Sequence, residues 1–240
     1  MERNNLRRRI GSQQILPGAL ETKVDVIFVI DGSESMQNGL EDLKSRILSI
    51  PDAIEENMAS KNRRIVRMRV KVIVFRDVYR DTNAFEKSDW FIIPGEQDKF
   101  REFLEGIRAE GGSDGPRSGL EALRLAISEF EPLEGRGRQF IILMTDAPAH
   151  RLDDPRRNND PAYPEWMNDC HTLEGLETIW EELNVRYRRM YIIAPNAYPW
   201  TTMQNWVPVC CEVCPSGQGI AIELIDVLYS LFGIAIGGVI

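Results

Sequence analysis

Acidic and hydroxyl side chains gather at three places in the sequence, each bordering an apolar or amphipathic segment. Asp31–Ser35 reads Asp-Gly-Ser-Glu-Ser and follows one apolar run, Gly111–Asp114 reads Gly-Gly-Ser-Asp, and Asp146 closes another apolar run. Carboxylate and hydroxyl oxygens are hard ligands, which suit Mg²⁺, Mn²⁺ or Ca²⁺ better than zinc. These segments therefore predict an oxygen-ligated metal site, provided that the fold brings them together.

The spacing within the first segment has a physical interpretation. In a turn that follows a strand, Asp31, Ser33 and Ser35 can converge on one point while the residues between them face away. Asp31 would then supply charge, and the two serines would supply neutral oxygens. The alternative is that the serines only cap the next helix, as serine often does.

The elements that must position these residues alternate between strands and helices. Short apolar runs rich in β-branched residues predict buried parallel strands at Val24–Ile30, Phe140–Met144, Met190–Ala194 and Val209–Val213. Apolar residues at three- and four-residue spacing predict helices at Met36–Met58 with a kink or restart at Pro51, and at Gln97–Ile107, Ser118–Phe130 and Leu173–Tyr187. This alternation predicts an α/β fold with a doubly wound sheet.

Three further segments have distinct patterns. Trp90–Ile93 predicts a short strand. Ile65–Phe75 alternates apolar and basic residues, which is typical of a half-exposed or edge strand, so we expect the charges of Arg63–Lys71 on a solvated sheet edge. Ala147–His171 is irregular and rich in Asp, Asn, Arg and Pro. A loop of that length inside a compact domain is usually functional or a docking element.

The apolar run that ends in Asp31-Gly-Ser33-Glu-Ser35 resembles the opening of a von Willebrand factor A (vWA) domain, and the motif resembles its metal-ion-dependent adhesion site, MIDAS. The resemblance covers roughly residues 24–236. It implies a Rossmann-like, mostly parallel sheet flanked by helices, with Mg²⁺, Mn²⁺ or Ca²⁺ held by these three residues and by Asp146. Members of the family bind partner proteins by letting a partner carboxylate complete the coordination of the metal.

The second segment departs from the adhesion-receptor pattern, in which the Gly-Gly turn presents a metal-binding threonine. Gly111–Pro116 is similar instead to a Gly-Gly-Gly-Asp-x-Pro variant of microbial and intracellular vWA proteins. We place Asp114 at the metal, with Ser113 as the alternative. A third carboxylate beside Asp31 and Asp146 would make a site with a divalent cation formally −1, so an incoming carboxylate would be attracted more weakly.

Composition and the chain ends limit the other possibilities. The 240 residues carry 29 basic and 37 acidic side chains, and the net charge of −8 argues against a general nucleic-acid-binding protein. We expect residues 1–23 to form a basic arm and 24–240 a vWA domain with a long loop at about 147–171. No export signal is recognisable, so the expected location is cytoplasmic. Two acidic residues within Ile220–Ile240 favour a core helix over a membrane span, with a membrane-anchoring helix as the alternative.

Cysteine usage leaves two interpretations open. Cys170, His171, Cys211 and Cys214 could form a zinc site that ties the long loop to the last strand. The lack of a second Cys-x-x-Cys pair favours the alternative, in which the cysteines, including Cys210, pack as small hydrophobic residues. We therefore do not expect zinc at Cys211 and Cys214.

The long loop starts directly after the third polar segment, so it should emerge on the face that carries the metal. Charged residues around aromatic ones are typical of the rim and anchors of a protein interface. The candidate partner contacts in this loop are Arg151, Arg156, Arg157, Tyr163 and Trp166.

Two classes of function follow. The first is a non-enzymatic, metal-dependent module for protein–protein interaction, acting as an adaptor or regulatory subunit. The resemblance to intracellular vWA proteins implies an AAA+ ATPase, a kinase or a protease as partner, in a microbial stress or antiviral defence system. The second is a Mg²⁺-dependent hydrolase that uses the carboxylate cluster. Serine ligands and the lack of a general base beside them disfavour hydrolysis.

Overall fold

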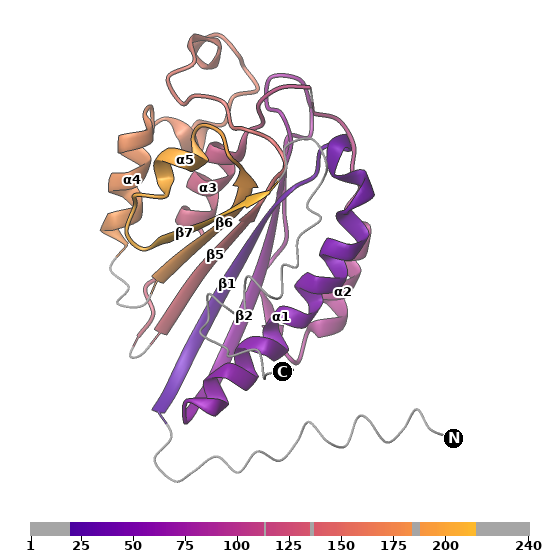
Figure 1. Ribbon diagram of the computed structural model, residues 1–240, viewed down its shortest axis with the longest axis vertical. Helices are drawn as coiled ribbons and strands as arrows, with labels where there is room; N and C mark the ends of the chain where they lie inside the picture. The colour runs from indigo at the N-terminus through magenta and orange to yellow at the C-terminus, as the bar shows by residue number, and fades with distance from the viewer. Residues whose placement is uncertain (1–19, 113, 135–136, 184–187, 215–240) are drawn as a thin grey trace, which may run out of the picture.

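One mixed sheet forms the centre of the molecule (Figure 1). The computed structural model describes residues 20–112, 114–134, 137–183 and 188–214. Within them, seven strands pair in the order β3-β2-β1-β5-β6-β7, with β4 also paired to β2. Five strands run parallel, whereas β3 and β4 run antiparallel to β2. The strands are β1 (Leu20–Asp31), β2 (Arg63–Phe75), β3 (Phe85–Lys87), β4 (Phe91–Ile93), β5 (Gly137–Met144), β6 (Arg188–Pro195) and β7 (Val209–Cys214).

Helices cover both faces of this sheet. Figure 1 shows α1 and α2 on one face and α3, α4 and α5 on the other. These helices are α1 (Leu40–Ser60), α2 (Gln97–Gly106), α3 (Gly119–Ser128), α4 (Leu173–Glu182) and α5 (Trp200–Met203). The mostly parallel α/β sandwich predicted from the alternation of strands and helices is therefore confirmed.

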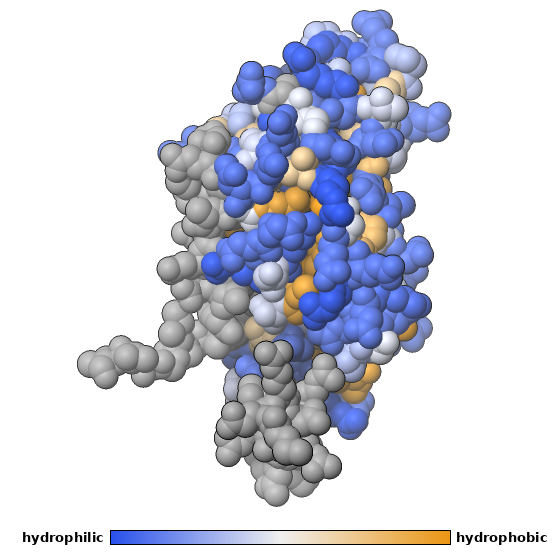
Figure 2. All heavy atoms as spheres, turned by 90° about the vertical axis from the view of Figure 1, so that its right-hand side faces the viewer, coloured by the Kyte–Doolittle hydropathy of each residue, from blue (hydrophilic) through white to orange (hydrophobic). Residues whose placement is uncertain are grey.

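Each face of the sheet has its own apolar core. Val26, Phe28 and Ile30 of β1 point towards α1 and α2, while Ile27 and Val29 point towards α3, and all five are essentially inaccessible to solvent. This is the period of two of a strand that is buried on both faces. Figure 2 views the molecule from the side of α1 and α2 and shows a mainly hydrophilic surface, with apolar side chains visible between the polar ones.

The sheet changes its winding direction at β1. β2 lies on one side of β1 and β5 on the other, so the connections that follow these strands leave in opposite directions. In open α/β sheets, the crevice at such a point, beyond the carboxyl ends of the strands, is the usual binding place. Asp31 is the last residue of β1, and Asp146 follows shortly after the end of β5.

Several boundaries differ from the sequence predictions. β1 already begins at Leu20, inside the segment expected to be an arm, because its first residues pair with the start of β2. The predicted helix Met36–Met58 is divided, since a 3₁₀ helix, η1 (Glu34–Asn38), precedes α1. Pro51 is buried within α1, which continues on both sides of it as one element.

β2 is paired on its outer side from Met68 onward, which corrects the edge-strand prediction for that part of the strand. β3 and β4 pair with its outer side, so its basic side chains are partly enclosed. Lys71 is 5% exposed and its Nζ lies 2.8 Å from Glu129 Oε2. Arg69 Nη2 lies 2.9 Å from Oδ2 of Asp25, a residue of β1 with no exposed surface. Ion pairs therefore replace the predicted solvated edge at Arg69 and Lys71, whereas Arg63–Arg67 stays at least partly exposed, as the alternating pattern predicted.

The predicted loop at 147–171 has a defined local structure. It contains two 3₁₀ helices, η2 (Pro155–Asn158) and η3 (Glu165–Met167). The guanidinium of buried Arg157 donates hydrogen bonds of 2.6–3.0 Å to three main-chain carbonyls of the same segment, those of Leu152, Met167 and Cys170. These bonds join distant parts of the segment and hold it as one unit.

Some of the predictions lie outside the described residues. They concern most of the basic arm, Ser113, the side chain of Cys214 and the stretch Ile220–Ile240. Across the four described ranges, no helix is both long enough and apolar enough to cross a membrane.

Candidate functional site

The first polar segment turns sharply at the end of β1. The main-chain N–H of Ser33 donates a 2.9 Å hydrogen bond to Oδ1 of Asp31, which folds the segment back on the strand end. Gly32 makes this turn because the position of a Cβ atom there would lie 2.6 Å from Val74 Cγ1. Asp31 and Ser33 are completely buried, whereas Ser35 is partly exposed.

Side-chain oxygens from β1 and β5 meet at this turn. Ser33 Oγ lies 3.1 Å from Ser35 Oγ, and Ser35 Oγ donates a 2.9 Å hydrogen bond to Oδ1 of Asp146. Thr145 Oγ1 donates to Oδ2 of Asp31 at 2.5 Å. The structure thus brings four of the five residues predicted for the metal site into one connected group, together with Thr145.

Burial dominates the electrostatics of this group. It raises the pKa of Asp31 above its ordinary value, because a charged carboxylate loses its hydration there. Hydrogen bonds from Ser33 and Thr145 and the positive charge of Arg117 act in the opposite direction. A carboxylate in such a place is stabilised by further positive charge.

The Gly-Gly turn of the second segment packs directly against the first. Both glycines have positive φ, +67° at Gly111 and +78° at Gly112, a conformation that glycine adopts without strain. The main-chain N–H of Glu34 donates to the carbonyl of Gly111 at 3.1 Å. Asp81 Oδ2 accepts the N–H of Gly112 at 2.8 Å and so fixes the turn from the opposite side.

Arg117, and not Asp114, points its side chain at the contact between the two segments. A Cβ atom on Gly112 would lie 2.7 Å from Ser33 Cβ and 2.9 Å from Arg117 Nε, so both side chains flank this glycine closely. Arg117 is 4% exposed, and its Nη1 donates to the carbonyl of Gly115. Asp114 is exposed. Its assignment to the metal, like that of Ser113, stays a prediction.

Comparison with known proteins identifies the fold family. The family model described as von Willebrand factor type A domain matches residues 26–148, which include both strand ends and both turns of the site. The chain belongs to the von Willebrand factor type A domain family. Domains of this family are generally protein-interaction modules, and many of them bind a divalent cation.

Individual relatives are distant. The vWA chain is 26% identical over 162 residues to the putative ariadne-like RING finger protein R811 of Acanthamoeba polyphaga mimivirus. This match covers 67% of this chain but only 14% of that protein. Proximal thread matrix protein 1 from the mussel byssus is similar in structure, with a TM-score of 0.52 and 14% identity over 90% of this chain and 46% of that one. A von Willebrand factor type A protein from Catenulispora acidiphila has a TM-score of 0.45 and 11% identity, and the match covers 88% of this chain and 42% of that one. At 14% identity, the match to the byssus protein supports the fold alone.

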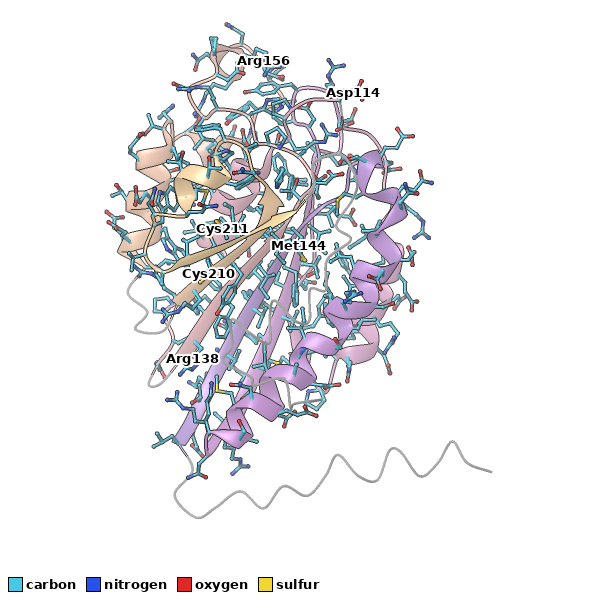
Figure 3. The ribbon with its side chains drawn as sticks, in the orientation of Figure 1. Asp114, Arg138, Met144, Arg156, Cys210 and Cys211 are labelled. Carbon is cyan, nitrogen blue, oxygen red and sulfur yellow. The ribbon has the colours of Figure 1, made fainter. Side chains whose placement is uncertain are left out.

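A cleft of about 930 Å³ opens beside the oxygen cluster of the vWA domain. Gly112, which touches Ser33, lines this cleft together with Asp114, His150 and Arg156. Figure 3 shows Asp114 and Arg156 on loops at the same end of the sheet. The cleft therefore lies on the face where the three polar segments end.

The predicted partner contacts divide into exposed and structural residues. Arg151 and Arg156 line the cleft, and each forms an ion pair with a nearby carboxylate of the loop. Trp166 is 36% exposed, with one edge of its ring against Phe85. Arg157 is 8% exposed and binds carbonyls within the loop, so its guanidinium is not presented to a partner, which corrects that prediction.

Tyr163 also has an internal contact. Its hydroxyl donates a 3.0 Å hydrogen bond to Oε1 of Glu121, a residue of α3 with no exposed surface. Glu121 Oε2 has no hydrogen-bond partner among the described residues. Burial raises the pKa of Glu121 to about 7, although Tyr163, His150 and Arg157 oppose the rise. The ring of Tyr163 also stacks on Tyr79, so this pair ties the loop to the body of the domain.

The cysteines that the structure describes are enclosed by apolar neighbours. Cys170 is fully buried, and burial raises the pKa of its thiol to about 11. Cys211 packs against the same core, and burial raises the pKa of its thiol to about 12. His171 is exposed and bonds to the carbonyl of Asn168. Within the described part of the chain, no three or more His, Cys, Asp or Glu side chains form a group that could hold a metal.

Three residues that shape the site were not assigned to it from the sequence. Thr145 stands beside Asp146 at the end of the same apolar run, so the sequence pattern could have indicated it. Arg117 directly follows the second polar segment, whereas Asp81 lies far from all three segments and no local pattern pointed to it. Their positions depend on which loops meet at the carboxyl end of the sheet.

Proposed function

We propose that this vWA domain binds a divalent cation at the end of β1 and β5, and that it uses this face to bind another protein without turning over a substrate. Asp31, Ser33, Ser35 and Asp146 would hold the cation, with water in the remaining positions. Mg²⁺ is the first choice, with Mn²⁺ and Ca²⁺ as alternatives. When bound, the cation would supply positive charge and an open coordination position.

The proposal rests on the convergence of oxygen atoms from two strands. Ser33, Ser35 and Asp146 form a continuous chain of oxygen contacts of 3.1 and 2.9 Å. Adjacent ligands in an octahedron with Mg–O distances of 2.0–2.1 Å are about 2.9 Å apart. The donor set and its spacing therefore suit Mg²⁺, and small side-chain rotations would exchange the hydroxyl contacts for metal contacts.

The charge of the site supports a role in binding anionic groups. Two carboxylates, Asp31 and Asp146, balance one divalent cation. Asp114 is exposed, so we do not count its carboxylate among the charges of the site. Arg117 adds a positive charge next to Ser33. The formal −1 estimated from the sequence depended on Asp114 as a ligand. Without that ligand, a loaded site is not negative.

The neighbouring cleft gives a partner further surface to contact. Exposed guanidinium groups of Arg80, Arg151 and Arg156 and the ring of Tyr198 lie along it. Arginine and tyrosine are frequent in the central contacts of protein interfaces. We infer that a partner reaches the metal with one acidic side chain and contacts the cleft with its flanking residues.

The hydrogen bonds of His150 disfavour its use as a general base in hydrolysis. A general base must have a nitrogen atom free to accept a proton from water. His150 Nε2 lies 3.0 Å from Asp77 Oδ1, and its Nδ1 lies 3.3 Å from Arg156 Nη2. Because protein groups engage both nitrogen atoms, we assign no catalytic residue and keep the Mg²⁺-dependent hydrolase as the alternative.

For the biological setting, we propose an adaptor or regulatory subunit in the cytoplasm. Its partner would be an AAA+ ATPase, a kinase or a protease of a microbial stress or defence system. The family supports the interaction role, and the choice among these partners comes only from the resemblance to microbial vWA proteins.

The test compares partner capture by three proteins. Wild type, Ser35→Ala and Ser49→Ala are immobilised and incubated with extract of the native cells, with Mg²⁺ or with EDTA. Ser49→Ala is the matched control, because it also removes a serine hydroxyl but lies on α1, where it bonds to the carbonyl of Arg46. We expect wild type and Ser49→Ala to retain the same proteins only with Mg²⁺.

Equal recovery by Ser35→Ala, or recovery unaffected by EDTA, would contradict the proposal. Metal-dependent hydrolysis of a phosphate or carboxylate ester by wild type, lost in Ser35→Ala, would support the hydrolase instead.

A further inference from the structure

We propose that Arg117 is a built-in cation of the metal site: it stabilises the metal-free carboxylates and competes electrostatically with the bound metal. The inference rests on the proposed function in one respect, which is that the metal binds next to Asp31. It assigns a role to a residue directly after the second segment that is neither a metal ligand nor a partner contact.

The position of Arg117 is set by its main chain and by two glycines. Its N–H donates to the carbonyl of Pro148 and its carbonyl accepts from the N–H of His150, both at 2.9 Å, which fixes the backbone beside the end of β5. The side chain then runs under the Gly-Gly turn. Only hydrogen at Gly112 leaves room for Ser33 on one side and the guanidinium on the other.

Burial strengthens the electrostatic effect of the Arg117 charge on Asp31. Arg117 is 4% exposed and Asp31 is completely buried, so little water screens the interaction between them. An exposed arginine such as Arg80, whose side chain is 68% exposed, would be screened far more strongly. The guanidinium therefore acts on this cluster as a permanent and weakly screened positive charge.

The same charge has opposite effects on the two states of the site. Without metal, Asp31 and Asp146 leave the cluster at −2, and Arg117 reduces this to −1. With a divalent cation, the carboxylates and the metal sum to zero, and Arg117 makes the site +1. Arg117 therefore stabilises the metal-free domain and lowers its metal affinity.

The test measures metal affinity and thermal stability in four proteins. Wild type, Arg117→Gln, Arg117→Lys and Arg80→Gln are stripped with EDTA, dialysed and titrated with Mn²⁺ by calorimetry, and Tm is recorded with and without Mn²⁺. Arg117→Lys retains the buried charge, and Arg80→Gln removes an exposed charge from the cleft beside the site.

We expect Arg117→Gln to bind Mn²⁺ roughly tenfold more tightly than wild type, because the substitution removes one weakly screened positive charge. Its metal-free Tm should fall below that of wild type, and its rise in Tm on adding Mn²⁺ should be larger. Arg117→Lys and Arg80→Gln should bind Mn²⁺ within about twofold of wild type.

The outcomes separate this inference from the proposed function. Mn²⁺ binding by wild type that Arg117→Gln leaves unchanged or weakens would overturn the inference and keep the metal site. Mn²⁺ binding by Arg117→Gln alone would support the inference and contradict metal dependence of the wild-type domain. Equal tightening by Arg117→Lys and Arg117→Gln would overturn the role of the charge, as would an absence of binding in all four proteins.

Discussion

Glu121 makes the stability of this domain depend on pH in a direction that can be stated in advance. Its side chain is fully buried in α3, with one oxygen bonded to Tyr163 and no hydrogen-bond partner for the other among the described residues. Burial raises its pKa from an ordinary value of 4.5 to about 7. The folded state therefore binds this proton more tightly than the unfolded state does.

The sign and the size follow from that difference. The contribution of Glu121 to stability is fully present below pH 4.5 and is lost as the pH rises through 7. Each pH unit between the two pKa values corresponds to about 1.4 kcal/mol, so the total loss is about 3 kcal/mol. Glu121→Gln removes the ionisation while keeping the shape of the side chain.

The assay is urea denaturation of wild type, Glu121→Gln and Glu105→Gln at pH values from 5 to 8. We expect the free energy of unfolding of Glu121→Gln to exceed that of wild type by about 2–3 kcal/mol at pH 8, and to be within about 1 kcal/mol of it at pH 5. Glu105→Gln is the control, because it removes an exposed carboxylate of α2. A difference between Glu121→Gln and wild type that does not change with pH would refute the reasoning.

Three other substitutions, one of them with a matched control, test buried contacts of the fold. Asp25→Asn should lower the free energy of unfolding by about 3 kcal/mol, because it breaks the buried pair with Arg69; a loss below about 1 kcal/mol in urea denaturation would contradict this. Gly112→Ala should destabilise by about 1–3 kcal/mol and weaken Mn²⁺ binding, since its methyl group would meet Ser33 and Arg117 at positive φ. The matched Gly106→Ala, where a Cβ meets nothing within 4 Å, should be neutral or slightly stabilising. Arg157→Lys should speed proteolytic cleavage within 147–171, because an ammonium group cannot bind the same three carbonyls; an unchanged cleavage rate would contradict this.

The sequence was most informative where a polar residue adjoins an apolar strand. Asp31 and Asp146 follow such strands directly, and parallel strands bring their carboxyl ends to one edge, so their proximity could be predicted without knowing the loops. For β2, the local pattern was right only over the first residues of the strand. Its alternating basic residues predict an exposed edge, but β3 and β4 cover that edge from Met68 onward, where Asp25 and Glu129 neutralise Arg69 and Lys71.

Contacts made across the sequence could not be predicted in this way. Asp114 and Arg117 stand three residues apart in one turn, and the choice of which of them faces Ser33 depends on the fold of Gly111 and Gly112. Arg157 looked like a surface charge in a polar loop, yet it binds that loop's own carbonyls. In each case, the deciding partner is a main-chain group or a side chain that becomes a neighbour only after folding.

The most direct test of the central claim is a calorimetric titration of the EDTA-stripped domain with Mg²⁺, repeated with Ser35→Ala and Ser49→Ala. Ser35 Oγ contacts both Ser33 and Asp146, so Ser35→Ala should remove one ligand and the hydrogen bonds that position two others. Ser49 lies away from the site. We expect one saturable Mg²⁺ site per chain in wild type and Ser49→Ala, and binding at least about tenfold weaker in Ser35→Ala. Saturable binding of equal affinity in all three proteins, or none in wild type, would contradict the assignment of this face as a metal site.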